Sequence, residues 1–237
     1  MANFNTHISV AAVGSGLLST VGLGTGLVNP TEMIILFVMG TIGGILPDID
    51  LGHSSPTKIM FTSLAAIFAF LVMFSKASTY SIVELWLIWI FCYAIIRYLA
   101  WEVFTEFTAH RGIIHSLVAA CFFWFLTTAL SYHLFDFSQL FSWLAGFFVF
   151  LGFMIHLGLD EIYSVDFTNK RLKRSFGTAM KIIDYKNYKT SALMIGAMVL
   201  MFYMTPKADN FVELFSNGQT YANIWGNLFP DGTWFEM

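Results

Sequence analysis

The chain has 237 residues, of which 57% are hydrophobic and only 11% are charged. Soluble domains usually carry about 25% charged residues, so this composition has too little charge to cover a soluble surface and excludes an ordinary water-soluble protein. The net charge of -3 is small and does not indicate a nucleic-acid partner. We therefore expect the lipid bilayer to be the solvent for most of the chain.

Seven apolar segments have a length close to the roughly 20 residues that a membrane-spanning helix needs. The expected spans are about Ile8–Leu27, Met33–Leu46, Lys58–Phe74, Ile82–Trp101, Ile113–Tyr132, Leu140–Leu159 and Ser191–Met204. The second and the last are short, and the sequence leaves open whether they cross completely. The sequence predicts an all-α protein, a polytopic transmembrane helical bundle of about seven spans that forms a single domain over residues 1–237.

Glycines are concentrated in the first apolar segment and at the end of the second. The first contains Gly14 and Gly16, and the second ends in Gly40, Gly43 and Gly44. Small residues allow membrane helices to approach closely, so we expect a tightly packed helix pair here. A phosphate-binding glycine loop is less well supported, because no strand precedes these glycines.

The basic residues predict the orientation of the chain in the membrane. Seven of them lie between the sixth and seventh segments: Lys170, Arg171, Lys173, Arg174, Lys181, Lys186 and Lys189. Because basic loops stay in the cytoplasm, the loop at about 161–190 is predicted to be cytoplasmic. Alternating crossings place Lys58, Arg97 and Arg111 on the same side, and only Lys76 and Lys207 on the other. The N-terminus is then cytoplasmic, and the tail at about 206–237 is extracytoplasmic.

Most of the histidines and several aspartates fall at the predicted cytoplasmic ends of the spans. Seven residues at this depth are candidate metal ligands: His7, Asp48, Asp50, His110, His115, His156 and Asp160. His156 and Asp160 are four residues apart, so they share one helix face. Imidazole and carboxylate ligands suit zinc or manganese. Ionisable groups at membrane depth are costly and usually face a site or cavity, so we expect a divalent metal here.

Each of these residues also has a simpler interpretation. A single histidine or aspartate at a helix end can be an interfacial residue solvated by water. Asp160 and Glu161 lie near a helix C-terminus, where acidic groups oppose the helix dipole, and this favours a cation nearby. His53 can be a ligand or a solvated loop residue, whereas His133 falls on the outer side and is excluded from the site.

Three motifs occur in a fixed order along the chain. They are Leu46-Pro47-Asp48-Ile49-Asp50, then His110-Arg111-Gly112-Ile113-Ile114-His115-Ser116, then the stretch from Gly152 through His156 to Asp160. Together with Thr6-His7, they resemble the YdjM-like, LexA-regulated, membrane-bound metal-dependent hydrolases over most of the chain. Ile114 departs from the threonine that many relatives have, which should affect packing more than chemistry.

The resemblance has consequences for the site, because that family is distantly similar to zinc-dependent phospholipase C. It implies a helical phosphoesterase site that holds one to three divalent ions, with zinc expected and manganese as the alternative. It implies as ligands His7, Asp48, His110, His115, His156 and Asp160. It implies that Asp50 is a ligand or a base.

The expected function is the hydrolysis of a phosphoester of a lipid or lipid-linked substrate at the cytoplasmic face of a bacterial inner membrane. A divalent metal supplies an activated water and polarises a phosphoryl oxygen. We expect Asp50 to be the general base, with Glu161 as the second candidate. Arg111 either holds a phosphate oxygen or is a snorkelling interface residue.

Two other functions remain open at this level. A transporter would carry ionisable residues at mid-membrane and on both faces, whereas here they are concentrated on one. A non-catalytic membrane scaffold would hold a structural metal, in a site closed by protein ligands. The sequence indicates neither the substrate nor the oligomeric state.

Overall fold

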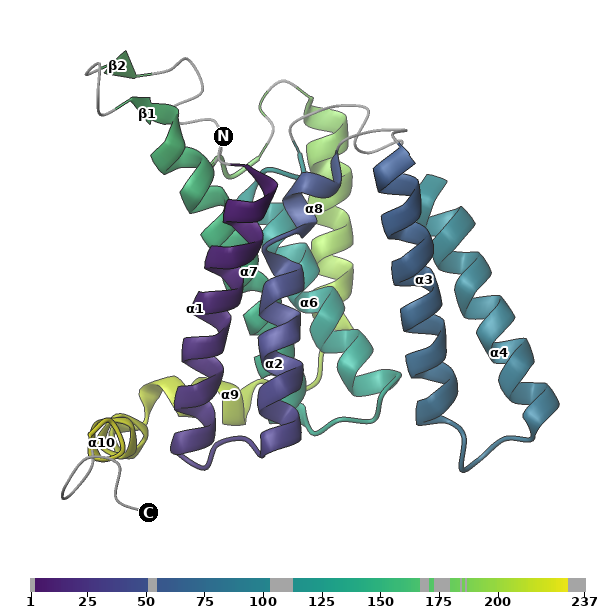
Figure 1. Ribbon diagram of the computed structural model, residues 1–237, viewed down its shortest axis with the longest axis horizontal. Coiled ribbons are helices and arrows are strands. Elements are labelled where there is room, and N and C mark those ends of the chain that lie inside the picture. Colours follow the sequence, from purple (N-terminus) through teal and green to yellow (C-terminus); the bar gives the residue numbers. More distant parts are fainter. Residues whose placement is uncertain are drawn as a thin grey trace.

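Most of the described chain is helical (Figure 1). The computed structural model describes residues 3–50, 55–102, 113–166, 171–172, 180–183, 185 and 187–229. The α-helices are α1 (Phe4–Gly24), α2 (Pro30–Gly43), α3 (Ser55–Ser75), α4 (Ile82–Ala94), α6 (Leu117–His133), α7 (Gln139–Ser164), α8 (Tyr188–Tyr203), α9 (Asp209–Ser216) and α10 (Gly218–Gly226). A 3-10 helix, η1 (Leu46–Asp50), follows α2, and a π-helix, η2 (Ile95–Ala100), continues α4. The strands β1 (Val165–Asp166) and β2 (Arg171–Leu172) form a short antiparallel pair.

A helix lies at each of the seven apolar segments predicted from the sequence. Within the residues that the structure describes, four helices are long and apolar enough to cross a membrane: Phe4–Gly24, Pro30–Asp48, Ile82–Ala100 and Gln139–Ser164. Three further helices in the described chain are apolar but shorter: Leu64–Ser75, Leu117–His133 and Tyr188–Tyr203. The helical membrane fold is confirmed, with the small β1–β2 pair as an addition, while the count of seven crossings stays a prediction.

Local capping explains where two of the apolar helices begin. Asn29 precedes Pro30 at the start of α2, and its side chain accepts a hydrogen bond from the Glu32 N–H at 2.9 Å. The Glu32 carboxylate accepts the Asn29 N–H in return, also at 2.9 Å. At the start of α4, the Glu84 carboxylate likewise accepts the Ser81 N–H, at 2.8 Å. Each pair satisfies N–H groups that the first turn of a helix leaves without partners.

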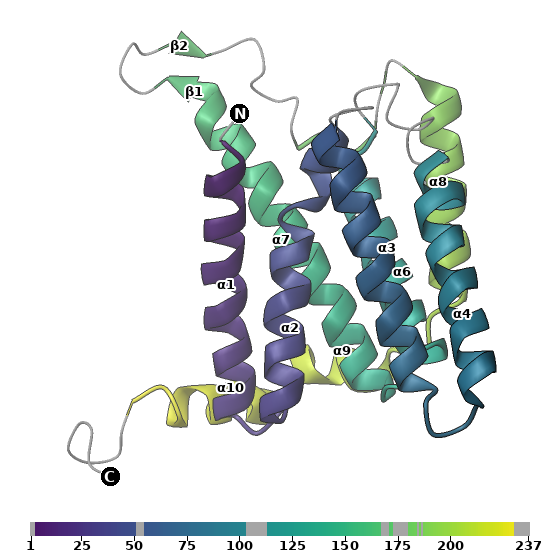
Figure 2. The same cartoon turned by 45° about the vertical axis from the view of Figure 1, so that its right-hand side comes forward.

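The central helix is α7, which packs against α1, α2, α6 and α9 (Figures 1 and 2). A Cβ on Gly152 would overlap the carbonyl oxygen of Gly40, and a Cβ on Gly43 would overlap the carbonyl oxygen of Val149. These contacts join the backbones of α2 and α7 directly. The predicted close packing at the glycine-rich segments is therefore present, but it involves a third helix as well as the first two.

Two hydrophobic clusters hold the bundle together at different levels. One contains Leu36 of α2 and Phe141, Trp143 and Phe148 of α7, together with Phe211 of α9. The other contains the buried side chains Ile113, Ile114, Val118, Ala119, Ala120, Phe153, Leu157 and Met194. The second cluster connects α7 with the start of α6 and with α8. It includes Ile114 and Leu157, the chain neighbours of His115 and His156.

The helices α3 and α4 form a hairpin that stands beside this bundle (Figure 1). Among the described residues, an ion pair and a ring contact connect the hairpin to the loop after α6. Lys76 forms an ion pair with Asp136, with Nζ and Oδ2 2.5 Å apart. The rings of Phe68 and Phe135 meet edge to face, with centroids 5.8 Å apart.

The region expected to be only an extracytoplasmic tail, about 206–237, contains the two short helices α9 and α10. They lie across the end of the bundle opposite the N-terminus (Figure 2). Phe211 of α9 is buried and stacks on Trp143, with ring centroids 5.5 Å apart. The helix α9 is therefore packed onto the bundle, which the sequence analysis missed.

Candidate metal centre

Five of the predicted site residues come from four separate stretches of chain and meet at one end of the bundle. His7 lies near the start of α1, and Asp48 lies in η1. His115 immediately precedes the cap of α6, while His156 and Asp160 lie in the last turns of α7. A 26-residue helix is about 39 Å long, which exceeds the roughly 30 Å hydrocarbon core, so the end of α7 reaches the membrane boundary.

The side chains of these residues are close together. Asp160 is in the middle of the cluster: its Oδ1 lies 3.2 Å from His7 Nε2. Its Oδ2 lies 3.6 Å from His156 Nε2 and 3.8 Å from His115 Nε2. Asp48 Oδ1 lies 3.6 Å from His156 Nε2. The rings of His7 and His156 stack with centroids 3.6 Å apart.

These residues form two groups that could each hold a metal ion, and the groups share His156. One consists of His7, His156 and Asp160, all buried. The other consists of Asp48, His115 and His156. Within each group the candidate ligand atoms lie within 4.8 Å of one another. Ligands about 2.1 Å from one ion are roughly 3–4 Å apart, so small side-chain adjustments would bring either group onto a cation.

The hydrogen bonding of the imidazoles supports this interpretation. Within the described structure, the Nε2 atoms of His7, His115 and His156 are buried and have no hydrogen-bond partner. Buried polar atoms are normally hydrogen-bonded, so three such atoms in one place need an explanation. A divalent cation would accept their lone pairs and balance the carboxylates, and the residues present therefore fit a metal.

The other nitrogen of His156 is held by the backbone. Its Nδ1 donates a hydrogen bond to the carbonyl oxygen of Gly44, 2.8 Å away. This contact fixes the tautomer in which Nε2 carries the lone pair, as commonly found for metal-binding histidines. The backbone at Gly44 can lie close to α1 because Gly44 has no side chain. A Cβ there would overlap the Cβ of Ala11 on α1.

His115 is positioned by the N-terminus of α6. Ser116 caps this helix: its hydroxyl accepts the Ala119 N–H at 3.2 Å and donates to the Ile113 carbonyl at 2.5 Å. Ile114 is buried in the second hydrophobic cluster, in keeping with the packing role expected for it. Burial, followed by the proximity of His156, lowers the pKa of His115 to about 4. The imidazole is then neutral near pH 7, as a metal ligand must be.

Lys181 is a residue near the site that the sequence analysis did not single out. Its carbonyl oxygen accepts the Leu117 N–H at 3.0 Å, and the carbonyl of Ile182 accepts the Val118 N–H at 3.3 Å. These bonds hold residues 181 and 182 against the start of α6, and the charge of Lys181 contributes to the lowered pKa of His115. The sequence showed Lys181 only as one cation of a basic loop.

The remaining predicted residues are placed differently. His53, His110 and Arg111 lie outside the described residues, and so does the side chain of Asp50, which ends η1. Glu161 follows Asp160 on α7, but it belongs to neither candidate group in the described structure.

His133, which the sequence analysis excluded from the site, lies away from the clustered residues. His133 ends α6, and its Nε2 lies 2.7 Å from the carbonyl oxygen of Met204, at the end of α8. This contact is at the opposite end of α6 from His115. His133 therefore joins two helix ends and takes no part in the cluster of His7, His156 and Asp160.

Comparison with known families gives a match over most of the chain. A family model described as YdjM inner membrane protein matches residues 1–215. The chain belongs to the YdjM inner membrane protein family. The match covers all five clustered residues, and with the apolar helices it supports a membrane protein. The family's description names a membrane location and no activity. No curated protein and no solved structure matches the chain.

Proposed function

We propose that this YdjM-family protein is a metal-dependent hydrolase that acts on a phosphoester of a lipid or lipid-linked molecule at the cytoplasmic face of the inner membrane. The main support is the cluster of three buried Nε2 atoms that have no hydrogen-bond partner among the described residues and that face the carboxylates of Asp48 and Asp160. Zinc suits this combination of imidazole and carboxylate ligands best. When bound, the metal would supply an activated water and polarise a phosphoryl oxygen.

The side chains of the cluster are buried to different degrees, which supports a catalytic metal site rather than a purely structural one. The side chains of His7, His156 and Asp160 are at most 1% exposed, whereas those of His115 and Asp48 are 14% and 23% exposed. A structural metal is enclosed by its ligands, and a catalytic one keeps an open position. In this proposal the first three residues anchor the metal, and the other two line the side from which substrate enters.

The proposal also assigns residues to substrate binding. Lys181, held beside the N-terminus of α6, would bind a phosphate oxygen on the open side, because ammonium groups are common phosphate ligands. Asp50 remains the proposed general base, with Glu161 second, and Arg111 remains a proposed phosphate contact. An interface site among apolar helices suits a substrate whose polar head stays attached to a lipid tail.

The test measures metal and turnover together. The protein is purified gently in detergent, analysed for bound metal, and assayed for phosphate release from a panel of phospholipids and lipid-linked phosphates. Wild type should carry at least one divalent ion per chain. His156→Ala and Asp160→Ala should lose both metal and activity, because losing one ligand of a buried site leaves the others unsatisfied.

His133→Ala is the matched control, since it removes a histidine from the other end of α6 and should keep metal and activity. Metal-free wild-type protein would contradict the proposal at its first step. Bound metal without phosphate release from any substrate would instead favour the scaffold with a structural metal.

A further inference from the structure

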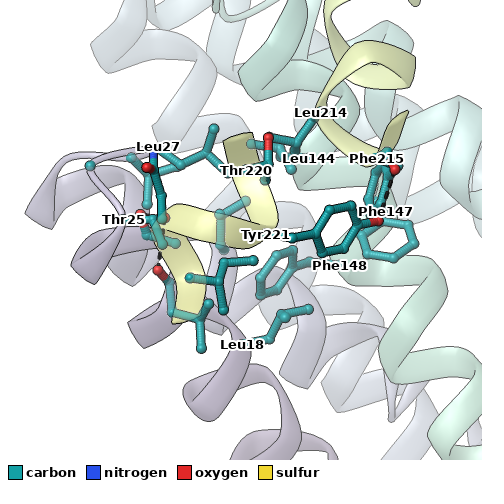
Figure 3. Close-up of a pocket in the computed structure, with 17 residues that line it drawn as sticks. Leu18, Thr25, Leu27, Leu144, Phe147, Phe148, Leu214, Phe215, Thr220 and Tyr221 are labelled. Carbon is teal, nitrogen blue, oxygen red and sulfur yellow. Dashed lines mark hydrogen bonds between the residues drawn. The ribbon is translucent and has the colours of Figure 1, made fainter. Parts of the chain in front are cut away.

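A cavity, drawn in Figure 3, lies at the end of the bundle formed by the end of α1 and the start of α2, away from the His and Asp cluster. Its volume is about 300 Å³, and it lies between the end of α1, the turn into α2, the first half of α7 and the helices α9 and α10. Most of its walls are aliphatic and aromatic, with contributions from Leu18, Leu36, Phe147, Phe148 and Leu214. The cavity lies among membrane helices, so its natural surroundings are lipid.

The polar groups of the lining offer little to a polar ligand. Among the residues that the structure describes, none that lines the cavity is charged. The Thr25 hydroxyl donates to the Val21 carbonyl at 2.9 Å, and the Tyr221 hydroxyl donates to the Phe215 carbonyl at 2.8 Å (Figure 3). Both hydroxyl protons are thus already committed within the protein. Thr220 and Asn223 add polar atoms from α10 only.

Physical chemistry narrows the possible contents of such a space. An empty apolar cavity forfeits dispersion contacts along its whole lining. Water needs several polar partners to occupy a buried site, and the apolar walls supply few. Small-molecule sites begin near this volume and are mostly apolar with a few polar groups. The most abundant apolar molecule around a membrane protein is the lipid acyl chain.

The position of α10 indicates how a chain would enter. This helix lies across the end of the bundle (Figures 1 and 2), and it exposes Tyr221 and Trp225, which are 55% and 74% exposed. Tyr and Trp concentrate at the boundary between membrane and water, so α10 is placed at that boundary. From there the cavity extends along α1 and α2 toward Leu18 and Leu36, into the hydrocarbon level.

We propose that this cavity binds one acyl chain of a membrane phospholipid, with the head group at the level of α10. The chain fills the space between Leu36, Phe148 and Leu214, and the polar atoms of Thr220 and Asn223 face the ester region. The bound lipid connects α9 and α10 to α1, α2 and α7. This role does not depend on the metal centre or on its chemistry.

Photocrosslinking tests the proposal directly. The full chain is reconstituted in vesicles that contain phosphatidylcholine with a diazirine near the end of one acyl chain, irradiated, and mapped by mass spectrometry. Leu36 and Phe148 are 1% and 3% exposed, so bulk lipid cannot reach them. Crosslinks at these two residues therefore report a chain inside the cavity, and we expect them in the wild type. Their absence would overturn the proposal.

Two variants on the same helix give a matched comparison. Leu214→Trp puts an indole into the cavity, whereas Val212→Trp adds it at a position that is 58% exposed and does not line the cavity. Crosslinking at Leu36 and Phe148 should fall about tenfold in Leu214→Trp, because an overfilled cavity excludes the chain. It should be unchanged in Val212→Trp, and an equal signal in both variants would overturn the proposal.

Two further measurements keep this result interpretable. Crosslinking at exposed Leu87 of α4, and the metal content, should be the same in every variant, which reports an intact fold. If Leu214→Trp does not fold, Thr220→Trp narrows the same cavity from α10 and should give the same loss. Neither readout involves turnover, so failure of the proposed hydrolase would leave this result standing.

Discussion

Two apolar helices, α7 and α4, have nearly the same hydropathy and opposite surroundings. In the most apolar 18-residue stretch of each, the mean hydropathy is 2.0 within Gln139–Ser164 and 1.8 within Ile82–Ala100. In the most apolar stretch of each, 67% of the residues of α7 are buried, and none of the residues of α4. Hydropathy therefore identifies helices that can cross a membrane, but it does not identify the helix at the centre of the bundle.

Small residues account for the difference. Along α7, Ser142, Ala145, Gly146 and Gly152 are buried, and glycine positions there touch neighbouring backbone. The sequence of α4 contains no glycine and several bulky aromatic and branched side chains. In a bilayer, helix association depends on close packing, because lipid tails are as apolar as the side chains. The helix with small residues becomes central, and it also carries His156 and Asp160.

The largest expected effect comes from adding one methyl group at the closest contact. Gly152→Ala places a Cβ against the carbonyl oxygen of Gly40, and backbone cannot move aside as a side chain can. We expect a loss of about 3 kcal/mol or more in unfolding free energy, with loss of bound metal, measured by denaturation in detergent and by elemental analysis.

Gly158→Ala is the control on the same helix, because a Cβ there meets nothing within 4 Å. Replacing a helical glycine by alanine should stabilise the protein by up to about 1 kcal/mol. If both variants behaved alike, close packing would not explain the central position of α7.

A leucine-to-alanine substitution on each helix tests the same contrast, with a smaller expected change in unfolding free energy. Leu157 of α7 is fully buried in the second cluster, whereas Leu87 of α4 is 60% exposed. Leu157→Ala should lower the unfolding free energy by about 2 kcal/mol, the lower end of the range for buried leucines, because lipid removes much of the transfer contribution.

Leu87→Ala should change the unfolding free energy by less than about 0.5 kcal/mol. Thermal unfolding of the two variants in the same detergent measures the difference. Equal destabilisation would mean that α4 is covered by a partner that the chain by itself does not show.

The smallest effect concerns two cations. Lys181 is held at the start of α6 beside His115, whereas Arg97 lies on η2, with its guanidinium 5.5 Å from the ring centre of Tyr98. Given the proposed phosphoesterase activity, Lys181→Ala should raise KM about tenfold, the loss expected for one hydrogen bond to a charged group. Metal content should not change.

Arg97→Ala should leave KM unchanged, because the α3–α4 hairpin carries none of the clustered residues. Steady-state kinetics on the preferred lipid substrate give both values. A larger effect from Arg97 than from Lys181 would place substrate on the hairpin side of the molecule.

The sequence predicted the helices and the clustered residues for different reasons. Long apolar segments are visible without any knowledge of packing. The positions of His7, Asp48, His115, His156 and Asp160 followed from topology, because alternating spans place distant residues at one depth. Their approach to within 4 Å could only be expected, since it depends on how α1, α2, α6 and α7 pack.

Other features depended on contacts that a sequence pattern does not contain. Lys181 reaches the site only because residues 181 and 182 bond to the start of α6. Glu161 is adjacent to Asp160 in sequence, but consecutive helical residues do not share a face. The helices α9 and α10 have 8 and 9 residues, and helices this short depend on tertiary packing for their stability.

The carbonyl oxygen of Gly44 connects the packing of α2 against α7 with the candidate metal centre. Gly44 is the C-cap of α2, and Asp48, four residues later, donates its N–H to Ile45 instead. The oxygen at this helix end is therefore available to His156, and it sets which ring nitrogen faces the carboxylates. Only a chain in which α2 has already closed onto α7 presents that nitrogen in a fixed direction. A cation held by His156 would accordingly depend on this contact between α2 and α7.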